Sequence, residues 1–180
     1  MPKHIAFLKA INVGGHTVKM DDLKTLFVKM GFTNVETFIA SGNVFFETKA
    51  KNIDSIKQKI EQGLEKALGY KVAAFIKTQK ELREIADYKP FKESELNTKG
   101  NSLYIAFLDN TPSELLQKKV LEFSTGYDEF HFYKKEMYWL SRKKFSESEF
   151  SGKILEKTLN IETTIRNSTT IKKIVYKYFQ

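Results

Sequence analysis

The stretch VETFIASGNVFFET, residues 35–48, consists of two runs rich in β-branched and aromatic residues on either side of Ser41-Gly42-Asn43. Runs of this composition favour extended strands, and a Gly-Asn pair between them is typical of a tight turn. The stretch therefore predicts a β-hairpin. Its flanking segments decide the fold, because they turn the hairpin into the centre of a larger unit.

Each side of the hairpin carries a helix and a strand. Before it, residues 4–10 form an apolar run of strand length, and apolar side chains follow at helical spacing from Met20 until Gly31. After it, residues 52–68 carry an apolar stripe that ends at Gly69-Tyr70, and residues 71–77 form another apolar run. The order β-α-β-β-α-β is the pattern of a ferredoxin-like unit.

The second half of the chain repeats this order after a charged segment. Residues 105–108 spell Ile-Ala-Phe-Leu, as residues 5–8 do, and Thr111-Pro112-Ser113-Glu114 predicts a helix start with Thr111 as the cap. A hairpin over 127–142, a helix near 153–159 and a strand over 161–166 follow. The last residues carry the spacing of an amphipathic helix capped by Asn167 or Ser168.

The predicted fold class is therefore α+β, with two ferredoxin-like βαββαβ repeats and a C-terminal helix. The N-terminal subdomain covers residues 1–88 and includes a short helix opened by the capping box Thr78-x-x-Glu81. Residues 89–101, broken by Pro90 and Gly100, form the linker, and residues 102–180 form the C-terminal subdomain.

Composition limits the function classes. The chain has no cysteine, which excludes disulfides and thiolate chemistry and fits a reducing cytoplasm. No segment approaches the roughly 18 apolar residues that a membrane span needs. The net charge of +8 favours a polyanionic partner, but only 3 of the 30 basic residues are arginines. No His or carboxylate cluster has metal-ligand spacing, so we expect no metal and no cofactor.

Topology gives the hairpin turn a neighbour. Residues 11–17, INVGGHT, follow the first strand, and the first β-α loop of a βαββαβ unit lies at the same sheet edge as the hairpin turn. Because the third strand pairs with the first, we expect INVGGHT and Ser41-Gly42-Asn43 to be in contact.

Four motifs stand out along the chain: K-A-I-N-V-G-G from Lys9, V-K-M-D-D-L from Val18, S-G-N-V-F-F from Ser41 and the late T-x-x-R-N. Together they resemble the pattern of the bacterial domain-of-unknown-function family 1697. The resemblance implies an α+β protein with ferredoxin-like parts and no established activity. It also implies a set of recurring polar and glycine positions: Asn12, Gly14, Gly15, Ser41, Gly42, Asn43, Arg166 and Asn167. Lys9-Ala10 stands where the family tends to have Arg-Gly, and Ser168 where it tends to have Trp.

These positions and His16 are the candidate ligand-binding residues, and each also has a structural explanation. Gly14 and Gly15 suit a turn as well as an amide cradle for phosphate or carboxylate, and no Walker or G-x-G-x-x-G pattern is present. Arg166 suits an anionic ligand or a buried acid. His16 suits general acid-base chemistry or an inert loop, and Ser41 lacks evident His and Asp partners, so the sequence identifies no catalytic residue and leaves open whether the protein is an enzyme.

Three hypotheses remain open. In the first, a small anionic or phosphorylated ligand binds between INVGGHT, the Ser41-Gly42-Asn43 turn and Arg166. In the second, the protein is a nucleic-acid-binding module that uses its lysines and the aromatic residues of its sheets. In the third, the motifs are structural and the protein works through a protein partner or as a scaffold.

Overall fold

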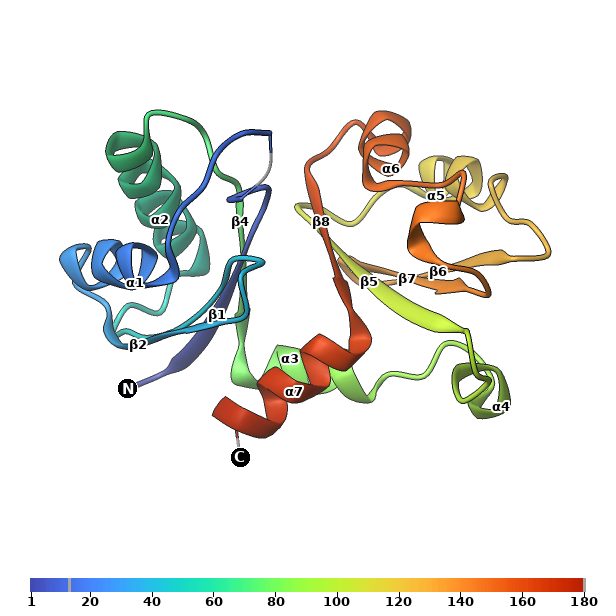
Figure 1. Ribbon diagram of the computed structural model, residues 1–180, viewed down its shortest axis with the longest axis horizontal. Coiled ribbons are helices and arrows are strands. Elements are labelled where there is room, and N and C mark those ends of the chain that lie inside the picture. The colour runs from blue at the N-terminus through green and yellow to red at the C-terminus, as the bar shows by residue number, and fades with distance from the viewer. Residues whose placement is uncertain (13, 180) are drawn as a thin grey trace. The chain divides into compact units, whose positions relative to one another are not determined.

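The computed structural model describes residues 1–12 and 14–179, which divide into two compact units (Figure 1). The first unit comprises residues 1–83 together with the end of the chain from Ile174, and the second comprises residues 84–173. Within the described residues, no helix is both long and apolar enough to cross a membrane.

The first unit is a four-stranded antiparallel sheet with two helices on one face. Its elements are β1 (Lys3–Leu8), α1 (Met20–Lys29), β2 (Thr33–Phe38), β3 (Asn43–Glu47), α2 (Ile53–Leu68) and β4 (Ala74–Thr78), and the sheet order is β2-β3-β1-β4. Alternate residues of a strand face the same side. Ala6 and Leu8 of β1 accordingly share one buried cluster with Phe27 of α1 and Ile60 of α2.

The second unit repeats this arrangement. Its elements are β5 (Ser102–Leu108), α5 (Glu114–Leu121), β6 (Asp128–Tyr133), β7 (Glu136–Ser141), the 3-10 helix η1 (Phe145–Glu147), α6 (Gly152–Leu159) and β8 (Thr163–Asn167). The sheet order is β6-β7-β5-β8, and Leu108, Val120, Trp139 and Leu155 are buried in one cluster. The predicted α+β class with two βαββαβ repeats and a C-terminal helix is confirmed.

The remaining elements are α3 (Gln79–Asp87), α4 (Glu93–Leu96) and α7 (Ser168–Tyr178). The predicted capping box opens α3, because the Thr78 and Glu81 backbone N–H groups donate to each other's side chains at 2.8 and 3.3 Å. Helix α4 lies within residues 89–101, which the sequence predicted as linker. Arg142 of the second unit donates to Glu95 of α4 and to Glu129.

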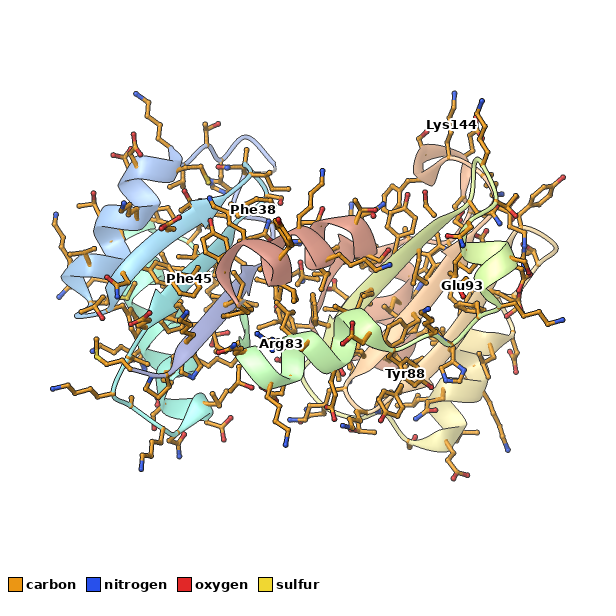
Figure 2. The ribbon with its side chains drawn as sticks, turned by 90° about the horizontal axis from the view of Figure 1, so that it is seen from below. Phe38, Phe45, Arg83, Tyr88, Glu93 and Lys144 are labelled. Atoms are coloured by element: carbon orange, nitrogen blue, oxygen red, sulfur yellow. The ribbon has the colours of Figure 1, made fainter. Side chains whose placement is uncertain are left out.

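The end of α7 covers the first sheet on the face opposite α1 and α2. The ring of Phe45 stacks on Tyr178 with centroids 4.8 Å apart, and Phe38 meets Tyr178 edge to face (Figure 2). Phe45 also contacts Phe179, at 5.8 Å between centroids. The aromatic residues of this face are therefore occupied by the chain's own terminal residues.

Two local predictions were wrong. Helix α5 is capped by Ser113 and not by Thr111, because Ser113 Oγ accepts from the Leu116 N–H. The hairpin turn is not a tight Gly-Asn turn, since Asn43 is the first residue of β3 and residues 39–42 form the loop. The loop takes this form because Ile39 and Gly42 adopt φ angles of 54° and 76°, and because the Asn43 side chain ties the two strand ends together.

Candidate functional site

In the loop between β1 and α1, three of the described residues have positive φ. These are Ala10, Gly14 and Gly15, with φ angles of 55°, 64° and 85°. Glycine adopts such angles without strain. Apart from its chain neighbours, a Cβ atom at Gly14 or Gly15 would meet no atom of the described residues within 4 Å, so each Cβ position faces open space. The backbone conformation, and not a lack of room, therefore favours glycine at these two positions.

Asn12 fixes this loop from both sides. Its Oδ1 accepts a hydrogen bond from the Val18 N–H at 2.6 Å, which closes the loop just before α1. Its Nδ2 donates to the Ala40 carbonyl at 3.1 Å, which joins the loop to the hairpin turn. The polar side chain of Asn12 thus determines where the exposed glycines lie.

The hairpin turn is packed against the same loop. The Leu8 N–H donates to the Gly42 carbonyl at 2.8 Å. A Cβ at Gly42 would lie 2.6 Å from Ile11 Cγ2, so only glycine fits there. Asn43 is fully buried and donates through Nδ2 to Ser41 Oγ at 2.8 Å. The polar groups of this turn therefore hold the backbone together.

The predicted contact between INVGGHT and Ser41-Gly42-Asn43 is confirmed by the Asn12–Ala40 hydrogen bond and the packing of Gly42 on Ile11. Pairing of β1 with β3 places Phe7 opposite Asn43, which brings the end of one strand to the start of the other. The described residues of the two segments thus lie together at one end of the first sheet.

Tyr70 is a residue at this end of the sheet that sequence reasoning missed. Its hydroxyl donates to the Ile11 carbonyl at 3.2 Å, and its ring stacks on His16 with centroids 3.8 Å apart. The sequence showed Tyr70 only as the residue after a helix-ending glycine. No local pattern connects it to a loop 59 positions earlier. The available signal was an aromatic residue in the connection from α2 to β4, which leads into the strand beside β1.

Arg166 and Asn167 belong to the second unit. Arg166 lies on β8 opposite Ile105, and its Nη1 donates to Thr164 Oγ1 at 2.8 Å. Burial lowers the pKa of its guanidinium to about 10, so it remains charged at neutral pH. Asn167 caps the start of α7, because its Oδ1 accepts from the Thr169 N–H at 2.8 Å. That Arg166 binds a ligand together with INVGGHT and the Ser41-Gly42-Asn43 turn stays a prediction.

The other two histidines lie on strands, as expected. Tyr88 Oη and His131 Nε2 are 2.8 Å apart, and Tyr88 also stacks on Tyr133 with centroids 4.0 Å apart (Figure 2). His4 is buried and stacks on Phe46. Across residues 1–12 and 14–179, no group of three or more His, Asp or Glu side chains could hold a metal ion.

His4 makes the stability of the first unit sensitive to acid. Burial lowers the pKa of His4, while the Pro2 backbone and the Glu81 carboxylate act in the opposite direction. The unfolded chain takes up this proton near pH 6.5 and the folded chain only at lower pH, so the free energy of unfolding falls as pH drops below about 6.5. We expect the urea midpoint to decrease between pH 7.5 and pH 5.5, and to decrease less in His4→Phe, which keeps a ring on Phe46 but cannot titrate. An equal decrease in both proteins would assign the acid sensitivity to other groups.

Fold and site together define a class: an α+β protein of two βαββαβ units whose first unit holds a glycine loop against a hairpin turn. The model of the family described as "Protein of unknown function (DUF1697)" matches residues 1–138. The chain belongs to this family.

A solved structure shares the whole fold. It is "The structure of conserved bacterial protein SP0830 from Streptococcus pneumoniae", with a TM-score of 0.73, 19% sequence identity and 97% of each chain covered. At this identity the similarity shows the fold alone. No curated protein matches the chain.

Proposed function

We propose that the protein binds a small anionic or phosphorylated ligand at the INVGGHT loop. The observation that carries this proposal is the pair of exposed glycines, Gly14 and Gly15, whose positive φ angles and open surroundings leave their backbone free to approach a ligand. Backbone N–H groups held in turn conformations near a helix start are suited to phosphate or carboxylate.

The residues around the glycines then have two roles. His16 is exposed and stacked on Tyr70, in a position to contribute a ring N–H to the ligand. Asn12, Ser41, Gly42 and Asn43 act as the support, since their side chains or backbones are engaged within the loop and the turn. Preorganisation of this kind lowers the entropy that a ligand must overcome on binding.

Arg166 and Asn167 stay candidate ligand-binding residues within the second unit, where the Arg166 guanidinium is charged at neutral pH. We also infer that both units are ferredoxin-like, because each has the order β-α-β-β-α-β. The similarity to a bacterial structure supports a bacterial origin, and the lack of cysteine supports a cytoplasmic location. The nucleic-acid alternative loses support on the first sheet, since Phe45 is covered by Tyr178 and Phe179.

Amide NMR spectroscopy tests the proposal. Titration with glucose 6-phosphate at constant ionic strength should shift the amide signals of Gly14, Gly15 and His16 in a saturable manner, whereas glucose should not.

In Asn12→Ala the loop loses two hydrogen bonds, and we expect stability to fall by about 1–2 kcal/mol and the apparent Kd to rise several-fold.

Asn52→Ala is the matched control for this titration. It removes the hydrogen bond from the Ser55 N–H that caps α2, at a comparable cost of about 1 kcal/mol, without touching the loop. If glucose 6-phosphate leaves the three loop amides unchanged, the proposal fails. If short RNA or DNA shifts them instead, and binding weakens steeply with salt, the nucleic-acid alternative replaces it.

A further inference from the structure

An open pocket of about 410 Å³ lies in the first unit at the end of the sheet where β1 begins and β4 ends. The INVGGHT loop lies at the opposite end of these strands. The start of β1 and the start of α3 line the pocket, and every lining residue belongs to the first unit. The loop follows the end of β1 at Leu8, whereas the pocket includes Lys3 and His4 at its beginning. Its volume is within the range of small-molecule sites, about 300–1,000 Å³.

The lining of this pocket is cationic. Lys80 and Arg83 are three residues apart on α3, so they lie on neighbouring positions of one helix face. Lys3 joins them from β1. Figure 2 labels Arg83 on α3. Both α3 side chains are exposed, and neither has a hydrogen-bond or ion-pair partner among the described residues. Lys3 donates only a long hydrogen bond of 3.5 Å, to the Tyr178 carbonyl.

Glu81, the residue after Lys80, directs its carboxylate to the cap of α3. The Glu81 carboxylate accepts from the Thr78 N–H at 2.8 Å and from Thr78 Oγ1 at 2.7 Å, as part of the α3 cap. The same cap occupies the Glu81 N–H, which donates to Thr78 Oγ1 at 3.3 Å. Gln79 is engaged with the Phe179 carbonyl at 3.1 Å.

His4 is the buried residue of the lining. It is 2% exposed, and its Nδ1 atom is itself buried. A ligand in the open pocket would therefore contact the three cations and not this atom.

We propose that the pocket formed by Lys3, His4, Lys80 and Arg83 is a second anion site, which binds the phosphate group of a small phosphate monoester. The Arg83 guanidinium presents paired N–H donors that match two phosphate oxygens, and the Lys80 and Lys3 ammonium groups supply further charge. This site is separate from the proposed loop site, and either can exist without the other.

Residue-resolved titration of the whole chain with inorganic phosphate, and then with glucose 6-phosphate, tests this site at constant ionic strength. We expect saturable shifts at the amides of Lys3, His4, Lys80 and Arg83 and at the Arg83 side-chain N–H groups. Lys80→Ala/Arg83→Ala should raise the apparent Kd at these amides at least about 10-fold, because it removes two charge-assisted hydrogen bonds.

The matched control is Lys24→Ala/Lys29→Ala, which removes the same charge from exposed positions of α1. The proposal predicts that this variant keeps the wild-type Kd at the pocket. Equal weakening in both double variants would reduce the effect to net charge and overturn the site, and so would an absence of saturable shifts. If the pocket amides of the wild type show no saturable shift while those of Gly14, Gly15 and His16 do, the loop site stands and the pocket proposal fails.

Discussion

Gly42→Ala should destabilise the first unit by about 2–5 kcal/mol. Alanine at the observed φ of 76° costs about 1–2 kcal/mol because its Cβ approaches the following carbonyl in the left-handed region. The added methyl would also lie 2.6 Å from Ile11 Cγ2 and 3.2 Å from Leu8 Cβ, and overpacking of this kind costs a further 1–3 kcal/mol or so. Urea unfolding followed by far-UV circular dichroism measures the change.

Gly69→Ala separates the two contributions. Gly69 has a similar φ of 82°, but a Cβ there would meet nothing within 4 Å, so only the backbone cost of about 1–2 kcal/mol applies. We also expect the effect of Gly42→Ala to be smaller in an Ile11→Ala background, since the atom that it strikes is gone. Equal losses for Gly42→Ala and Gly69→Ala would show that the loop and the turn are not in close contact.

The contact between loop and turn was predictable from topology, but its atomic basis was not. The order of elements fixes which strand ends share an edge, and strand order then follows from the hairpin. The Asn12–Ala40 hydrogen bond spans 28 residues, and the Tyr70–Ile11 bond spans 59. Side-chain partners at such separations depend on backbone positions of a few tenths of an ångström, which periodicity does not encode.

The motif residues also illustrate a limit of reading function from composition. Asn12, Ser41 and Asn43 have the polar side chains that a ligand site needs, and in the structure they bond to the backbone or to one another. Polar residues at turns compete for backbone groups in this way whether or not a ligand is present. The pocket of Lys3, Lys80 and Arg83 combines residues from a strand start and a distant helix, so no local motif marks it.

The second unit contains a buried charge whose loss should be equally costly. Asp128 is 2% exposed, and its Oδ1 accepts a hydrogen bond from the fully buried Trp139 Nε1 at 2.7 Å. Its Oδ2 accepts from Ser148 Oγ at 3.0 Å, which ties the segment before α6 to the sheet. Hydrogen bonds to a charged group contribute about 1.5–3 kcal/mol, and an indole N–H left buried without a partner costs more than the bond's net value.

Asp128→Ala should therefore lower the free energy of unfolding by about 3 kcal/mol. Asp128→Asn keeps a carbonyl acceptor for the indole and should cost about 1 kcal/mol. Trp139 is the chain's single tryptophan, so its fluorescence reports this unit directly during urea unfolding. If the two variants were equally stable, Trp139 would not depend on the Asp128 acceptor, and its burial would rest on the rings of Tyr104, Phe145 and Phe150 that surround it. The proposed difference between the variants thus isolates one hydrogen bond from the aromatic packing around it.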